Sequence, residues 1–219
     1  MSRGFVIAID GPAASGKGTI AVGLGRELGL PVLDSGLLYR AVAVTLLRQG
    51  GDPADPVAAE ARARGLDKDD LHDPAFRTRA AGEAASQAAV HPGVRTALMD
   101  FQRAFADQDG GAVIDGRDIG TVIVPGAPAK LFVTASPEAR AERRFKQLSG
   151  QGEQVRYEDI LADIRRRDER DMGRAAAPLV RAEDATLLDT TSMSISQAAD
   201  AARRIVEEAR ARWETSRRG

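Results

Sequence analysis

Cysteine is absent from the 219 residues of the chain, which excludes disulfides, iron–sulfur clusters, thiolate zinc sites and thiol catalysis. Asparagine is absent as well, so the chain holds neither an Asn-Lys-x-Asp box, which reads guanine, nor an acceptor for N-glycosylation. No apolar run approaches the roughly 18 residues that a membrane span requires. The first residues lead straight into an apolar segment and show no cleavable signal. We therefore expect a soluble, cytoplasmic protein that has no membrane partner.

An excess of charge of one sign is also missing. The 31 basic residues are balanced by 32 acidic ones, and only four of the basic residues are lysine. A net charge of −1 creates no field that would draw the whole protein onto nucleic acid. The hydrophobic fraction of 43% is enough for a packed core, and 219 residues fit one α/β domain with small appendages.

The distribution of apolar residues predicts strands that alternate with helices. Short apolar runs, several of them rich in β-branched residues, are typical of strands buried in a parallel sheet. Such runs occupy residues 5–10, 31–34, 112–115, 129–134 and 185–189. Amphipathic helices are expected at residues 17–28, 37–49 and 195–213, with a long, charged helical stretch at 136–174. This order predicts a three-layer α/β/α domain with a five-stranded parallel sheet.

Two segments are the longest departures from this alternation. Residues 50–93 open with a loop rich in Gly, Asp and Pro and continue with a helical pattern that breaks before Pro74 and Pro92. Residues 145–178 carry most of the charged helical stretch. Both are expected to be insertions over the C-terminal edge of the sheet, where open α/β folds bind their ligands.

A phosphate-binding loop is predicted between the first strand and the first helix. Residues 11–17 fit the pattern G-x-x-x-x-G-K in the strand–loop–helix context that gives the pattern its meaning. Backbone N–H groups would surround phosphate oxygens, and Lys17 would lie against the β- and γ-phosphates of a nucleoside triphosphate. The loop and its flanking residues are Gly11, Pro12, Ala13, Ala14, Ser15, Gly16, Lys17, Gly18 and Thr19. The alternative is a glycine-rich turn with a chance lysine, and the context disfavours it.

Metal ligands are scarce in the sequence. Gly18 stands where most loops of this kind carry the serine or threonine that binds Mg²⁺, which weakens an interpretation as a GTPase or motor. We expect Mg²⁺ to be bound by the nucleotide and water, with no metal ligand assigned to the protein. His72 and His91 lack metal-ligand spacing and are expected at the surface or at helix ends.

Arginine is abundant and gathers at the ends of predicted elements. Transfer between two phosphates needs positive charge on both sides, and arginine suits this task because it stays charged and binds phosphate in bidentate fashion. The clusters lie at residues 34–40, 115–121 and 165–174. In the third, Arg167, Asp171 and Arg174 continue an apolar helical stripe, which predicts a helix that runs from the core to the rim of a cleft. A solvated helix face with i,i+4 ion pairs explains that segment equally well.

Together these motifs resemble those of the bacterial cytidylate kinases, members of the nucleoside monophosphate kinase group. The resemblance covers nearly the whole chain. It includes residues 9–19, 33–40, 115–122, 167–171, 177–179 and 188–189. The motifs Asp-Ser-Gly-x-x-Tyr-Arg and Gly-Arg-Asp-x-Gly-Thr are far more specific than the phosphate loop, which adenylate and shikimate kinases share.

The resemblance implies phosphoryl transfer from ATP to CMP or dCMP, with Mg²⁺ bound to ATP and no covalent enzyme intermediate. It implies one P-loop kinase domain with a small helical acceptor-binding insert and a lid. The core would span residues 1–49, 108–144 and 179–219, the insert about 50–107, and the lid with the arginine-rich helix about 145–178. The expected partners are ATP and CMP or dCMP, with no specific nucleic acid, and the expected state is a monomer.

Roles for individual residues follow from the same resemblance, by matching position. The acceptor phosphate would be held by Ser35, Arg40, Arg117 and Arg174. Cytosine would be read by Ser86, Arg95 and Asp118, the ribose would be bound by Arg167 and Asp171, and Tyr39 belongs to the same CMP site. The residues that act on the transferring phosphoryl group would be Lys17, Arg117, Arg174, Arg143 and Arg144, the last two from the lid side.

Several alternatives stay open. Many members of the family carry a small antiparallel β insertion in the acceptor domain. The corresponding segment here, residues 50–85, is short, alanine-rich and helical in pattern. This difference affects how strictly the enzyme would select its base. A kinase that prefers AMP or UMP is a close rival, and a nucleotide-dependent switch or adaptor is a rival of another class. RNA binding by residues 140–174 is disfavoured, because ten basic and eight acidic side chains leave a small local excess.

Overall fold

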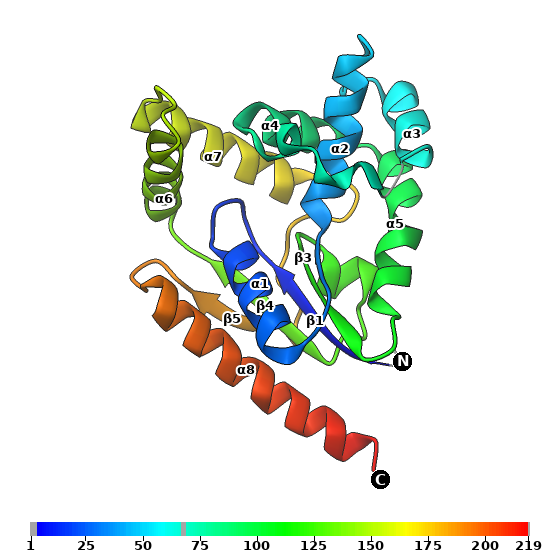
Figure 1. Cartoon of the computed structure of the whole chain (residues 1–219), viewed down its shortest axis with the longest axis vertical. Helices are drawn as coiled ribbons and strands as arrows, with labels where there is room; N and C mark the ends of the chain where they lie inside the picture. The colour runs from blue at the N-terminus through cyan, green and yellow to red at the C-terminus, as the bar shows by residue number, and fades with distance from the viewer. Residues whose placement is uncertain (1–3, 67–68, 219) are drawn as a thin grey trace.

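Five parallel strands form a sheet in the order β2-β3-β1-β4-β5 (Figure 1). The computed structural model describes residues 4–66 and 69–218 of the chain. The strands are β1 (Phe5–Asp10), β2 (Val32–Asp34), β3 (Gly111–Gly116), β4 (Ala129–Thr134) and β5 (Thr186–Asp189). Each strand end lies within one residue of its predicted position, so the predicted five-stranded parallel sheet is confirmed.

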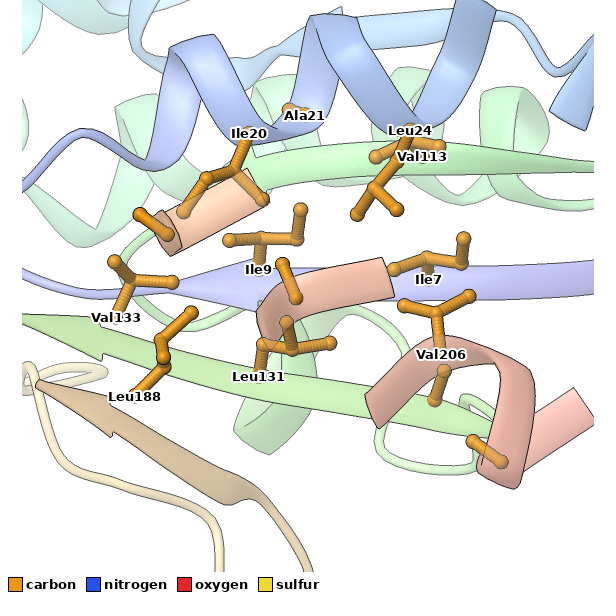
Figure 2. Packing of buried hydrophobic residues seen from close by; sticks show 14 of the residues in the cluster. Ile7, Ile9, Ile20, Ala21, Leu24, Val113, Leu131, Val133, Leu188 and Val206 are labelled. Carbon is orange, nitrogen blue, oxygen red and sulfur yellow. The ribbon is translucent and has the colours of Figure 1, made fainter. Parts of the chain in front are cut away.

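Helices cover both faces of the sheet and make the three-layer α/β/α core. On one face, Ile7 and Ile9 of β1 pack between α1 (Lys17–Leu28) and α8 (Ile195–Ser216), as Figure 2 shows. The alternate side chains of β1 point to the other face and pack toward α5 (Pro92–Ala106). Because β1 and β3 are buried along their whole length, their sequences are continuously apolar up to their polar last residues rather than alternating.

Helices also make up the described part of the segment between β2 and β3. The helices are α2 (Ser35–Arg48), α3 (Pro56–Arg64), α4 (Arg79–Ala88) and α5. Two 3₁₀ turns, at Asp69–His72 and Pro74–Arg77, lie between α3 and α4. Asp55 caps α3 and Thr78 caps α4 through their side chains, and Pro92 opens α5 where the pattern breaks. In the described part of residues 50–107 no strand occurs, which confirms the helical interpretation of this segment.

The long charged segment before β5 forms two helices rather than one uninterrupted stretch. They are α6 (Pro137–Gly150) and α7 (Tyr157–Gly173), and residues 151–156 separate them. Gly152 in this connection has φ +82, a left-handed conformation that favours glycine. The two helices pack on each other through a small apolar cluster. Figure 1 shows α4 and α7 lying across the space beyond the ends of the strands.

Other element boundaries differ from the predictions by a few residues. α2 begins at Ser35, two residues before its predicted start, because it follows β2 without a connecting loop. A π-helical turn at Ile119–Ile123, which was not predicted, follows β3. Within residues 4–66 and 69–218 no helix is both long and apolar enough to cross a membrane.

Candidate active site

The phosphate loop joins β1 to α1 in a conformation that depends on its glycines. Gly11 has φ +151, and a Cβ at this position would lie 2.0 Å from the backbone oxygen of Val133. Only glycine allows this close approach of two backbones. Gly16, with φ +92, precedes Lys17, the first residue of α1. The predicted strand–loop–helix arrangement is therefore confirmed, and the N-terminus of α1 offers its backbone N–H groups to an anion.

The Lys17 side chain is buried beside the loop. Its Nζ lies 3.4 Å from the carbonyl oxygen of Pro12 and 3.9 Å from Oδ1 of Asp115, at the end of β3. Burial, together with the positive charge of Arg117, lowers the pKa of Lys17 to about 8. Burial also raises the pKa of Asp115. A polyphosphate bound to the loop would favour the protonated amine and so keep Lys17 charged.

One cavity of about 910 Å³ extends from the phosphate loop to the predicted acceptor site. From the loop it is lined by Ala13, Ala14, Lys17 and Gly18. It is also lined by every residue predicted to bind CMP, namely Ser35, Tyr39, Arg40, Ser86, Arg95, Arg117, Asp118, Arg167, Asp171 and Arg174. These side chains come from α2, α4, α5, α7, the residue that follows α7 and the segment after β3, so the fold brings together residues that are far apart in the sequence.

Some predicted residues lie beside this cavity rather than in its lining. The loop residues outside the lining are Gly11, Pro12, Ser15, Gly16 and Thr19. Of the two arginines assigned to the lid side, Arg144 lines the cavity and Arg143 does not. The guanidinium of Arg143 donates to Oγ1 of Thr190 at 3.0 Å and to the carbonyl oxygen of Ser15 at 3.5 Å. Arg143 therefore touches the phosphate loop from its outer side.

Among the arginines predicted to bind CMP, Arg117 and Arg95 donate hydrogen bonds to carboxylates. Nε of Arg117 donates to Oδ2 of Asp171 at 2.9 Å. Burial alone would raise the pKa of Asp171, but the positive charges of Arg117 and Arg167 outweigh it, and the pKa lies below its usual value. Arg95 forms a buried ion pair with Asp118, and its guanidinium lies 5.7 Å from the ring centre of Tyr39. These contacts orient both arginines without the help of a bound ligand.

Other polar groups of the cavity are buried without a hydrogen-bond partner. They are Nε of Arg40, Arg167 and Arg174, and the hydroxyl of Ser86. Burial and the neighbouring Arg117 lower the pKa of Arg167 to about 10. Buried donors without acceptors destabilise a protein, and phosphate and carbonyl oxygens of a ligand would satisfy them. The cavity therefore has the charge and the free donors that suit a phosphorylated ligand.

Asp10 lies beside this site and supports it, a role that the sequence pattern did not reveal. Its two carboxylate oxygens accept hydrogen bonds from the backbone N–H groups of Ile119 at 2.8 Å and Gly120 at 2.7 Å. Burial raises the pKa of Asp10 to about 6. These bonds anchor the turn directly after Arg117 and Asp118. The available signal was an acidic residue at the end of an otherwise apolar buried strand.

The arginine-rich helix α7 combines the two interpretations of its sequence. On one side, Arg167 and Asp171 continue its apolar stripe into the cavity. On the other side, Arg165 is exposed and donates to Glu138 of α6 at 2.8 Å. One face of α7 therefore serves the cavity, and the opposite face carries solvated ion pairs.

The two histidines take no part in this site. His72 is exposed in a 3₁₀ turn, and His91 precedes α5 with its Nε2 3.1 Å from the carbonyl oxygen of Pro53. Their predicted location at the surface and at a helix end is confirmed. No group of three or more His, Cys, Asp or Glu side chains that could hold a metal ion occurs in the part of the chain that the structure describes.

Known proteins match this chain over most of its length. The family model described as cytidylate kinase matches residues 7–208. A cytidylate kinase from Caulobacter sp. (strain K31) is 68% identical over 209 residues, which are 95% of this chain and 97% of that protein. A cytidylate kinase from Xanthobacter autotrophicus is 62% identical over 207 residues, or 94% of this chain and 99% of that protein.

Solved structures with low sequence identity share the fold. An uncharacterized protein from Eubacterium ventriosum has a TM-score of 0.54 at 15% identity, over 93% of this chain and 98% of that chain. A sugar kinase from Janibacter sp. has a TM-score of 0.50 at 17% identity, over 93% of this chain and 95% of that chain. At these identities the likeness supports the α/β architecture alone.

Proposed function

This chain belongs to the cytidylate kinase family, and on that basis we propose that it transfers the γ-phosphoryl group of ATP to CMP or dCMP. The products are ADP and CDP or dCDP. The observation that carries the proposal is the single cavity that joins the phosphate loop to the buried arginines. Transfer between two anions needs cations near both, and this cavity offers Lys17 beside the loop and Arg117 beside the acceptor site.

ATP is proposed to bind with its phosphates against residues 11–19 and with Lys17 at the β- and γ-phosphates. Mg²⁺ bound with ATP neutralises phosphate charge. Gly18 has no hydroxyl to offer the metal, but Oδ2 of Asp115 lies 3.2 Å from the point that a Cβ on Gly18 would occupy. These residues fit a metal held mainly by ATP and water, with the carboxylate of Asp115 beside it.

The acceptor phosphate is proposed to bind Ser35, Arg40, Arg117 and Arg174. The Nε groups of Arg40 and Arg174 support this assignment, because each is buried without a partner and a phosphate oxygen would satisfy it. Arg167 and Asp171 would bind the ribose. An acceptor phosphate oxygen then attacks the γ-phosphorus in line, the bond to the β–γ bridging oxygen breaks, and ADP leaves without a covalent enzyme intermediate.

Cytosine is proposed to be read by Ser86, Arg95 and Asp118, beside Tyr39. Cytosine presents an amino donor next to two acceptors, which match a carboxylate and a guanidinium respectively. Uracil reverses the first two of these groups and would leave buried polar atoms unpaired. Such a mismatch costs about 1–3 kcal/mol, which favours CMP and dCMP over UMP.

Lid closure is proposed to exclude water from the transferring phosphoryl group. Arg144 lines the cavity and Arg143 donates to the carbonyl oxygen of Ser15, and both are proposed to approach the γ-phosphate when the lid closes. The division into core, insert and lid, the monomeric state and the cytoplasmic location expected from the sequence stay predictions.

The proposed function is tested by supplying purified protein with ATP, Mg²⁺ and one acceptor at a time: CMP, dCMP, UMP, AMP or GMP. ADP release should be rapid with CMP and dCMP and about 5- to 150-fold slower with UMP, as the mismatch penalty of about 1–3 kcal/mol predicts. It should also be slower with AMP and GMP. Equal turnover of UMP or AMP would retain a nucleotide kinase but reject the base-reading residues. Slow ATP hydrolysis without acceptor preference would favour a switch or adaptor.

ATP affinity should fall at alkaline pH because Lys17 has a lowered pKa of about 8 in the free protein. Bound phosphate holds the amine protonated, so binding takes up a proton once the pH exceeds that value. The Kd for ATP, measured by calorimetry at fixed salt, should rise about fivefold between pH 8 and pH 9. The phosphates of ATP are already ionised in this range. In the Lys17→Arg variant the guanidinium stays charged, so the Kd of this variant for ATP should not rise between pH 8 and pH 9. The same pH profile in the variant and in the wild-type protein would contradict the explanation.

A further inference from the structure

Arg140 of α6 connects three separate segments beneath the cavity. Its side chain is only 3% exposed, and its guanidinium makes four hydrogen bonds. Nε donates to the carbonyl oxygen of Ala135 at 2.9 Å, and Nη1 donates to the carbonyl oxygen of Ala13 at 3.2 Å. Nη1 and Nη2 also donate to the two oxygens of Asp168, the first at 2.9 Å. The bidentate pair has the geometry in which arginine binds a carboxylate most strongly.

Two of the three partners of Arg140 lie next to the two proposed substrate sites. Ala13 lies in the phosphate loop, next to Ala14, whose φ of +59 is unusual for a residue with a side chain. Asp168 lies on α7, directly after Arg167, which lines the acceptor end of the cavity. Neither Arg140 nor Asp168 lines the cavity itself. A single buried ion pair thus ties the backbone of the loop to the helix that carries the acceptor-site side chains.

We infer that Arg140 and Asp168 are positioning residues that couple the ATP loop to the CMP site. The inference rests on the proposed function and adds a role for a pair that touches neither substrate. When ATP orders the loop, the carbonyl oxygen of Ala13 fixes the position of Arg140 by accepting its hydrogen bond. Arg140 in turn fixes the position of α7 through its ion pair with Asp168. Arg167 is thereby fixed at the acceptor end. Binding of one nucleotide should therefore strengthen binding of the other, since linkage between two sites is reciprocal.

The same two helices supply a matched control pair. Arg165 of α7 donates to Glu138 of α6 at 2.8 Å, but these side chains are 56% and 54% exposed. This pair also joins α6 to α7 and makes no bond to the phosphate loop. A role limited to holding the helices together would belong to both pairs, whereas coupling to the loop belongs to Arg140 and Asp168 alone.

The test measures the Kd for CMP by calorimetry, without nucleotide and with a saturating β,γ-imido analogue of ATP. In the wild-type protein the analogue should tighten CMP binding about fivefold or more, a typical coupling between sites. Arg140→Lys keeps the charge but loses the planar fork that binds both oxygens of Asp168, and Asp168→Asn removes the charged partner. Both variants should reduce the ratio of the two Kd values to below about twofold. The double variant should be no worse than either single one, because the residues act as a unit.

Arg165→Lys is the control and should keep the wild-type ratio. A purely structural pair would lower the melting temperature and weaken CMP binding equally with and without the analogue. An unchanged ratio in Asp168→Asn or Arg140→Lys, or a wild-type ratio of one, would overturn the inference while leaving CMP phosphorylation intact. Absence of CMP-dependent turnover in the wild-type protein would instead overturn the proposed function. If Arg140→Lys fails to fold, Asp168→Asn decides the question, because its side chain keeps the shape of the original.

Discussion

Replacing Lys17 with methionine is expected to lower kcat for CMP phosphorylation by about a thousandfold. The amine would stabilise the negative charge that spreads over the phosphoryl group during transfer, and loss of one such group costs two to three orders of magnitude or more. Methionine keeps a similar length but removes both the charge and the N–H donors of the amine. The rate is measured as ADP release at saturating ATP and CMP, with ADP coupled to an optical signal.

Stability must be separated from chemistry in this variant, because Lys17 lies buried 3.9 Å from Asp115. Without the amine, the Asp115 carboxyl has no neighbouring lysine, and burial already raises its pKa. The double variant Lys17→Met with Asp115→Asn removes the unpaired charge, and it should fold and remain inactive. Lys146→Met alters an exposed lysine paired with Glu142 and should keep the full rate. A folded Lys17→Met protein that retained more than about a tenth of kcat would contradict the prediction.

The phosphate loop could be predicted from the sequence because its determinants are local. Gly11 and Gly16 are required by positive φ angles, and Lys17 stands at the first position of the helix that the loop opens. The strands could also be predicted, since a strand that is buried on both faces is a short run of apolar residues in the sequence. β1 has no exposed position at all, and its sequence ends in an acidic residue only where the site begins.

The break between α6 and α7 was not predicted, although Gly150 and Gly152 stand at it. Both helices are highly charged, and no proline stands between them. The connection is stabilised by contacts between distant residues, in which Leu148 of α6 packs with Ile160 and Ile164 of α7. The periodicity of apolar residues carries no information about such packing, because two packed helices and one long helix show the same periodicity.

The prediction of the acceptor site depended on the resemblance to the cytidylate kinases rather than on a local sequence pattern. Ser86 and Arg95 lie in an alanine-rich helical segment, and neither stands out there by its spacing. Their convergence with Asp118 results from the packing of α4 on α2 and of α5 on the turn after β3, which only the fold can show. The tie between Arg140 and Ala13 spans 127 residues and has a backbone carbonyl at one end, so it leaves no trace in sequence spacing.

The choice of base is expected to change when Asp118 is replaced by asparagine. The substitution keeps the shape of the side chain but turns one acceptor oxygen into a donor amide, which suits the carbonyl of uracil instead of the amino group of cytosine. The ratio of kcat/KM for CMP to that for UMP should fall about 10- to 100-fold, the factor that corresponds to one mispaired buried group. Steady-state kinetics with both acceptors at saturating ATP measures this ratio.

Asp171→Asn is the control that separates base choice from a general loss of buried charge. Asp171 and Asp118 are both buried carboxylates of the same cavity, and each is paired with an arginine, Arg117 and Arg95 respectively. Asp171 lies at the proposed ribose site, so its amide variant should lower kcat/KM for CMP and UMP by the same factor and leave their ratio unchanged. If Asp118→Asn also lowered both equally, its pair with Arg95 would serve only to stabilise the cavity, and cytosine would have to be recognised elsewhere. A selective loss of CMP turnover in Asp118→Asn alone would show that the carboxylate reads the amino group.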